Sequence, residues 1–299
     1  MAGVADGPSA RSKAAVDSSS RPSRRARTAT TALAEGRLDA AREAVRDVDP
    51  SSRDALLIEA VSAYENLQGP EAARLIAHLP ADASSAAILE ALAASDKAIA
   101  GTLRPKDGAL QQLADEQRLW GAIIAVDVAL DAGQLDTAER IAKERAFDPK
   151  VPAHAARLMR LRRYQAQGAA ALELAPTLAD ARAATPRAVS ELVLTFVGEA
   201  RVAAATSALA EMRAAAGALG PWLEVLVEKA RGHEPNAAKL LTALEPPEKA
   251  RPLVEQVVAL RALASMKDKR AKPYYAQLER RFRAQPDVLM AGKELGLVK

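Results

Sequence analysis

The side chains best suited to chemistry are two arginines and a tyrosine in the stretch RLMRLRRYQ. Arg157, Arg160 and Tyr164 are separated by three and then four residues, which places them on one face of a helix. A planar guanidinium binds a carboxylate through two parallel hydrogen bonds. The pattern therefore predicts a site that clamps an acidic group of a partner. The alternative is a solvated face on which the arginines pair with Asp and Glu side chains of adjacent helices.

A second cationic cluster occurs in the stretch MKDKRAKPYY, in a turn that contains Lys267, Lys269, Arg270 and Lys272. Ammonium and guanidinium groups in a turn suit a phosphate or an acidic partner. We therefore predict Lys269, Arg270 and Lys272 as further partner-binding residues. The alternative is a charged loop between helices, with Tyr274 and Tyr275 packed into the last helical hairpin.

Motifs for catalysis or for metal binding are missing from the sequence. The three histidines, His78, His154 and His233, are far apart and form no ligand pair, and the chain has no cysteine. There is no phosphate-binding glycine loop and no nucleophile elbow. We therefore predict a protein that is not an enzyme and that has no catalytic residue, no cofactor, no metal and no small-molecule substrate.

The excess positive charge lies at the start of the chain. The net charge is +4, and residues 1–30 hold six basic and two acidic side chains, so the remainder is neutral. Residues 1–20 are small, polar and aperiodic, which predicts a disordered leader. The arginines that follow could hold nucleic acid or an anionic membrane weakly, or they belong to a solvated tail: Arg21, Arg24, Arg25 and Arg27.

The elements that must position these residues are indicated by regularly spaced glycines. They recur 30 to 35 residues apart, at Gly36, Gly69, Gly101, Gly133, Gly168, Gly198 and Gly232. About 34 residues accommodate two helices of about 12 residues and two turns. Glycine suits the left-handed position after a helix, and a proline then marks the next boundary. Strand-like runs are nearly absent, hydrophobic residues make up 49% and aromatic residues 3% of the chain. We therefore predict an all-α protein with an aliphatic core.

The chain resembles the tetratricopeptide-repeat family, most clearly in the stretch AGQLDTAERIAKERAFDP. The resemblance covers roughly residues 20–299 and rests on the period, the glycine turn, a recurring alanine and the closing proline. Tyr164 fits one of the family's aromatic positions, and Ala, Leu or Val replace most of the others. The resemblance implies a right-handed α-solenoid of about eight antiparallel helix pairs over residues 21–299, with the first helix of each pair lining a concave groove. Related two-helix solenoids remain an alternative, and repeats of about 40 to 47 residues fit less well.

These features together predict an interaction protein. We expect a scaffold or adaptor that binds a segment of another protein on the concave face of the solenoid. The alternative is an adaptor for nucleic acid or an anionic membrane, attached through the basic tail and the Lys267–Lys272 turn. No run approaches about 18 apolar residues and no secretory signal is evident, so we expect a cytoplasmic protein.

Overall fold

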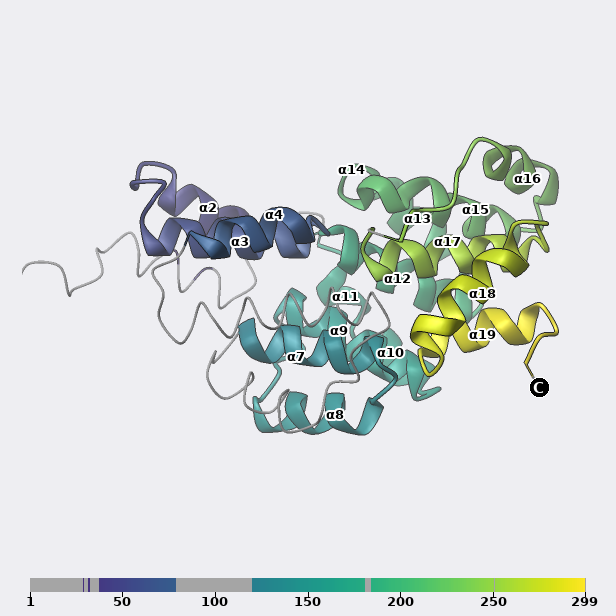
Figure 1. Ribbon diagram of the computed structural model, residues 1–299, viewed down its shortest axis with the longest axis horizontal. Helices are drawn as coiled ribbons and strands as arrows, with labels where there is room; N and C mark the ends of the chain where they lie inside the picture. The colour runs from purple at the N-terminus through teal and green to yellow at the C-terminus, as the bar shows by residue number, and fades with distance from the viewer. Residues whose placement is uncertain are drawn as a thin grey trace, which may run out of the picture.

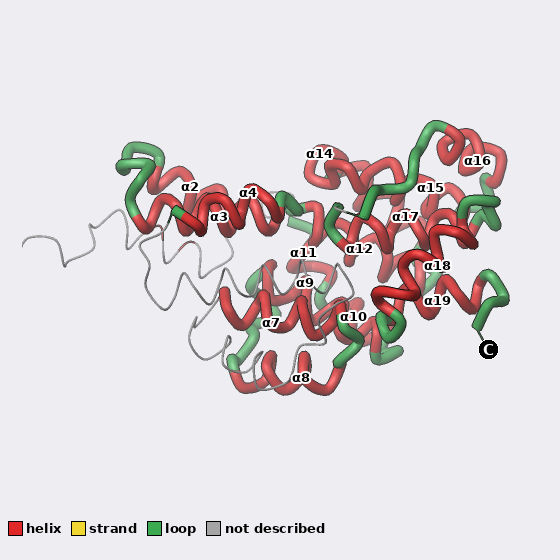
Figure 2. Tube along the Cα trace, viewed as in Figure 1, coloured by secondary structure: helices red, strands yellow, loops and turns green. Residues whose placement is uncertain are grey.

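The computed structural model describes residues 29, 32, 38–78, 120–180, 184–249 and 251–298, and every regular element in these residues is a helix (Figure 1, Figure 2). The all-α prediction is thus confirmed. The first half contains α2 (Leu38–Val45), α3 (Arg53–Glu65), α4 (Gly69–Ala77), α7 (Trp120–Asp131), α8 (Leu135–Glu144), α9 (Pro152–Tyr164), α10 (Gly168–Leu172) and α11 (Ala175–Leu178). The second half contains α12 (Pro186–Gly198), α13 (Val202–Glu211), α14 (Arg213–Ala216), the 3-10 helix η2 (Gly217–Leu219), α15 (Gly220–Ala230), α16 (Glu234–Thr242), α17 (Leu253–Ser265), α18 (Ala271–Phe282) and α19 (Pro286–Glu294).

Several sequence-based predictions fall outside the described residues. The leader at residues 1–20, the arginines at positions 21–27 and the glycines at positions 36 and 101 are among them. The boundary at residue 21, the number of helix pairs and the handedness of the array stay predictions. Within the described residues, no helix combines the length and the apolar character that a membrane span requires.

A left-handed residue closes the turn inside each described helix pair. The residue is Leu67, Gly133, Ala166, Ala200, Gly232 or Lys267, each with φ between 51° and 78°. In every one of these turns the next residue donates its N–H to the carbonyl five residues earlier, as Gln134 does to Ala129 at 2.8 Å. This is the Schellman closure of a helix end. The prediction that glycine occupies the left-handed position is therefore correct at Gly133 and Gly232.

The same prediction is wrong at three other glycines. Gly69 and Gly168 begin a helix, and Gly198 ends one. Non-glycine residues adopt the left-handed conformation in those turns, although it costs about 1–2 kcal/mol per residue. The closing hydrogen bonds of the helix end offset that cost. The period in the glycines therefore reports the spacing of the turns and not the residue that makes each turn.

Prolines start several of the helices, as the sequence predicted. Pro152, Pro186 and Pro286 each occupy the first turn of a helix, where the missing N–H has no intrahelical partner to lose. Thr185 accepts a hydrogen bond from the N–H of Ala188 at the start of α12. These caps fix the register of α9, α12 and α19, the helices that carry most of the charged residues described below.

The helices form an inner row and an outer row. Successive inner helices α7, α9, α12, α15, α17 and α19 contact one another, while α8, α10, α13, α16 and α18 each pack on an inner neighbour (Figure 1). The core consists mainly of Ala, Leu, Val and Ile, as predicted. One apolar cluster runs from α9 to α19 and a second joins α2, α3 and α4 to α7, α8 and α9.

The inner row curls so that its end meets its middle. The backbone carbonyl of Ala284, just before α19, lies so close to Gly133 that an added Cβ would come within 2.1 Å of it. Tyr164, at the end of α9, donates a hydrogen bond to Asp287 on α19 at 2.6 Å. This return brings side chains from six helices to one place.

Candidate functional site

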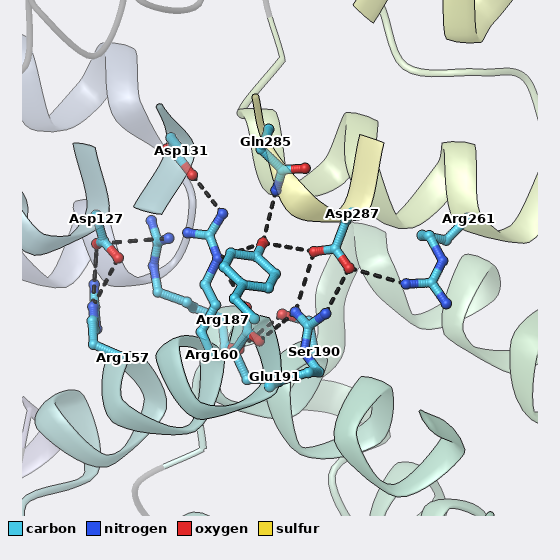
Figure 3. Close-up of polar contacts among 12 residues, drawn as sticks. Asp127, Asp131, Arg157, Arg160, Arg187, Ser190, Glu191, Arg261, Gln285 and Asp287 are labelled. Atoms are coloured by element: carbon cyan, nitrogen blue, oxygen red, sulfur yellow. Dashed lines mark hydrogen bonds and ion pairs between the residues drawn. The ribbon is translucent and has the colours of Figure 1, made fainter. Parts of the chain in front are cut away.

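A network of charged side chains fills the space between the inner helices (Figure 3). We call it the inner ion cluster, and it takes residues from α3, α7, α9, α12, α17, α19 and the loop before α19. Its members are Glu65, Asp127, Asp131, Arg157, Arg160, Arg163, Tyr164, Arg187, Glu191, Arg261, Gln285 and Asp287. The five guanidiniums face five carboxylates, so the cluster is electrically balanced.

Arg157 is the most completely bonded member of the cluster. It is 1% exposed. Its two terminal nitrogens bind the carboxylate of Glu65 at 2.9 and 2.7 Å, and Nη2 and Nε bind Asp127 at 2.7 and 3.1 Å. Nη1 also donates to the carbonyl of Ala153 at 3.2 Å. A guanidinium has five N–H groups, and all five of Arg157 have acceptors within the protein.

Arg160 and Tyr164 form the middle of the cluster. Arg160 Nη2 binds Asp131 at 2.5 Å, and Nε donates to the Tyr164 hydroxyl at 2.9 Å. That hydroxyl also accepts from Gln285 Nε2 at 2.7 Å while donating to Asp287. Its single oxygen therefore connects α9, the loop before α19, and α19.

Asp287 anchors the C-terminal side of the cluster. Arg163 donates to its Oδ1 at 2.6 Å and Arg261 does so at 3.0 Å. Arg163 reaches Glu191 as well, at 2.8 Å. Asp287 is 1% exposed, so these donors replace the water that a carboxylate normally binds.

The electrostatics of the cluster follow from burial and pairing. Burial alone would raise the pKa of Asp127, but Arg157 and Arg187 outweigh burial and lower that pKa to about 2. Burial would likewise raise the pKa of Asp287, but Arg163 and Arg261 outweigh burial and hold that pKa well below its usual range. Burial raises the pKa of Asp131, because Arg160 offsets the burial only in part. The arginines thus keep Asp127 and Asp287 ionised inside the protein.

This arrangement predicts loss of stability in acid. An Asp has a pKa of about 3.9 in the unfolded chain, above the folded values of Asp127 and Asp287. The contribution of these two carboxylates to folding stability is therefore fully present above pH ~4. It is lost as the pH falls towards their pKa values in the folded protein. The loss is about 1.4 kcal/mol per pH unit for each group. Asp131 has the opposite sign, because its raised pKa lets folding gain stability as it protonates.

Urea titrations followed by circular dichroism, at pH values from about 7 to about 2.5, would measure this loss of stability. We expect the urea midpoint to fall steeply below pH ~4. The control is Asp287→Asn, in which one of the two responsible carboxylates is missing, so the fall should be shallower. Parallel pH profiles for the two proteins would contradict the assignment.

The predicted partner-binding residues have unequal positions in the structure. Arg157 and Arg160 pair with Asp and Glu of adjacent helices, as in the alternative reading, but they are buried and not solvated. Arg270 caps the end of α16, because it donates to the carbonyls of Leu244 and Leu241 at 2.6 and 3.0 Å. Lys269 and Lys272 are exposed. A direct contact with a partner stays a prediction for all of these residues and for Tyr164.

The acidic members of the cluster were missed at the sequence level. Asp127 lies within the apolar run WGAIIAVDVALD of α7, and Asp131 ends that run. A carboxylate inside such a run must be buried with its helix, and a buried charge requires a partner. That signal would have led from Asp127 to the arginines of α9. Asp287 carries no comparable signal, since it lies beside a proline at a helix start, where an acid is ordinary.

An open groove of about 940 Å³ lies beside the inner ion cluster. Two walls that are far apart in the chain enclose it. The N-terminal wall consists of Arg42 of α2, α3, α4 and the turn between α3 and α4. The C-terminal wall consists of the start of α12, α14, η2, the two residues before α17 and the start of α17. The lining includes Arg42, Glu59, Ser62, Ala63, Asn66, Leu67, Gln68, Pro70, Glu71, Leu75, Pro186, Ala214, Ala215, Gly217, Ala218, Leu219, Arg251, Pro252 and Glu255.

Comparisons with known proteins leave the family of this chain open. No protein-family model matches it, and no curated protein matches it. Among solved structures, the chain is similar to a chain of the structure described as "Structure of phAimR-Ligand", with a TM-score of 0.43 and 11% sequence identity. The match covers 87% of this chain and 92% of that chain. A likeness at this level carries no argument about function, so the function must be inferred from the groove and the cluster.

Proposed function

We propose that this protein is a non-catalytic interaction protein that binds an uncharged, partly aliphatic segment of a partner protein in the groove. One observation carries the proposal: an open groove of about 940 Å³ lies between two helical walls. This volume is near the upper end for ligand-binding clefts. The inner face next to it is filled by the ion cluster, so the groove is the place where a segment has room.

The groove offers some apolar surface to a guest, within a lining that is more polar than apolar. Leu75 is half-buried, whereas Leu219 and Leu67 are buried in the walls and add little surface. The C-terminal wall exposes the small residues Ala214 and Ala218, which leave space for side chains of the guest. Each methylene that a guest buries here contributes about 0.8 kcal/mol. Aliphatic side chains of a partner segment therefore supply the binding energy.

The charges on the walls are already paired within the protein. Arg42 lies 3.3 Å from Glu59, and Arg251 lies 2.8 Å from Glu255. Glu71 is bound at 2.6 Å by Arg74, just outside the lining. A charged guest would have to break one of these pairs or be desolvated without a partner. The groove therefore favours an uncharged segment.

Exposed amides provide hydrogen bonds to the backbone of a guest. Asn66 and Gln68 lie in the turn between α3 and α4, and both are exposed. A side-chain amide both donates and accepts, so it suits a peptide group. The walls are helical before any guest arrives, which spares the cost of ordering the receptor.

The alternative function, attachment to nucleic acid or an anionic membrane, has less support. Its arginines at positions 21–27 lie outside the described residues. In the turn that was to assist them, Arg270 is committed to the end of α16. The groove, in contrast, consists of described residues and offers both polar and apolar surface, so we favour a partner segment.

Selection from a phage-displayed library of random peptides of about 12 residues would test the proposal. We expect the wild-type protein to select uncharged peptides rich in aliphatic residues. Ala214→Arg with Ala218→Arg fills the groove with two long cations, and each selected peptide should bind this variant at least about 10-fold more weakly, a difference of about 1.4 kcal/mol. Fluorescence anisotropy at low and high salt measures the affinities.

The matched control places the same two substitutions outside the groove. Ala203 and Ala210 lie on α13 and are exposed, so Ala203→Arg with Ala210→Arg adds equal charge there. This control should bind the peptides as the wild type does. The proposal fails if no peptide is selected, if the peptides bind both double variants equally, or if acidic peptides dominate and salt abolishes their binding.

A further inference from the structure

We infer that the inner ion cluster sets the separation of the two groove walls, with Arg157 and Arg187 as the positioning residues. This inference rests on the proposed function only where it concerns the binding of a partner segment, because the separation of the walls is a property of the free protein.

The cluster adjoins both walls of the groove. Glu65 directly precedes Asn66 and Leu67 in the N-terminal wall, and its carboxylate receives both terminal nitrogens of Arg157. On the other side, Arg187 directly follows Pro186 of the C-terminal wall. Residues that line the groove are thus next in sequence to residues of the cluster on both walls.

Arg187 also connects the walls directly. Its guanidinium lies 5.1 Å from the ring centre of Tyr64 on α3 and 3.7 Å from Asp127. The hydroxyl of Tyr64 in turn donates to Asp127 at 2.9 Å. A cation over an aromatic face is attracted to it, more strongly away from water. Tyr64 therefore ties the N-terminal wall both to α12 and to α7.

Apolar contact between the two walls is sparse. The apolar cluster that contains α12, α15 and α17 includes one buried residue from 38–78, namely Leu67. Most buried apolar residues of α3 belong to the second cluster, with α7 and α8. Within the described residues, the directional contacts that join the walls through the cluster are those of Glu65 and Tyr64. Ion pairs and hydrogen bonds fix an angle, whereas a single leucine does not.

Spin-label distances in the free protein test the inference. The chain has no cysteine, so labels attach only where cysteines are introduced. Ala77→Cys on α4 with Ala210→Cys on α13 spans the groove, and Ala210→Cys with Lys272→Cys lies within the C-terminal half. All three residues are exposed. Glu65→Gln keeps the shape of the side chain and removes its charge, and should lengthen and broaden only the distance across the groove.

Two further variants complete the design. Glu59→Gln makes the same change on the same helix, but its partner Arg42 belongs to the same half of the chain, so both distances should stay as in the wild type. Tyr64→Phe removes one hydroxyl, keeps the ring under Arg187, and should broaden the distance across the groove even if Glu65→Gln does not fold. The inference is overturned if the distance across the groove is unchanged in both Glu65→Gln and Tyr64→Phe, or if the distance within the C-terminal half changes equally.

A binding measurement separates this inference from the proposed function. If peptides are selected, Glu65→Gln should weaken their binding by about 10-fold, which is within the usual range of coupling between sites. Glu59→Gln should weaken their binding less. If no peptide is selected, the proposed function fails while the distances still decide the role of the cluster. Unchanged peptide affinity in Glu65→Gln would contradict the coupling of the cluster to the groove.

Discussion

Replacing Arg157 with methionine is expected to lower the free energy of unfolding by about 3–5 kcal/mol, the usual loss when one partner of a buried ion pair is removed. Methionine fills much of the same space, so the loss reports charge and hydrogen bonds more than a cavity. Glu65 and Asp127 would stay buried, 2% exposed each, without their principal cation. Urea unfolding followed by circular dichroism measures the difference.

The control for this prediction is an arginine on the surface. Arg46 pairs with Glu43, and its side chain is 71% exposed, so Arg46→Met should change the free energy of unfolding by less than about 1 kcal/mol. Adding Glu65→Leu to Arg157→Met should restore part of the loss, because Glu65 is then no longer an unpaired buried charge and Asp127 keeps Arg187 as a partner. An Arg157→Met protein as stable as Arg46→Met would disprove the role given to Arg157.

Asp287→Asn is the second change with a large expected effect, again about 3–5 kcal/mol of unfolding free energy. The amide is neutral, so Arg163 and Arg261 would face each other without the carboxylate that both of them bind at 2.6 and 3.0 Å. An amide oxygen can still accept one hydrogen bond, but its NH₂ group would oppose the guanidinium donors. We expect the loss at neutral pH, measured by urea unfolding.

A surface carboxylate provides the comparison for Asp287. Glu279 on α18 lies 3.6 Å from Arg283, whose side chain is 83% exposed. Glu279→Gln removes one negative charge from the same end of the protein and should cost less than about 1 kcal/mol. If Asp287→Asn and Glu279→Gln are equally stable, Asp287 does not anchor the cluster.

Local signals explain how far the fold was predictable. A helix pair every 30 to 35 residues follows from glycines, prolines and apolar periodicity, all of which act within a few residues. Which residue takes the left-handed position does not follow, since Ala166 and Ala200 adopt it as Gly133 does. The hydrogen bonds of the helix end decide that position, and any side chain that tolerates the cost can occupy it.

The candidate site was predictable only in part, for a different reason. The spacing of Arg157, Arg160 and Tyr164 correctly places them on one helix face, and all three meet in the inner ion cluster. Their partners come from other helices, up to 123 residues away in the chain. No short pattern records such a distance. The groove is even harder to predict from the sequence, because it is the space between two walls and not a motif in either wall.

The hydrogen bond between Tyr164 and Asp287 has a consequence for how the chain unfolds. In an open array of repeats each unit contacts only its neighbours, so stability is a sum of local terms and the ends can fray independently. Here α19, the last described helix, is bonded to α9, 123 residues earlier in the chain. We therefore expect loss of α19 to destabilise α9 as well, so that the described helices unfold together as one cooperative unit.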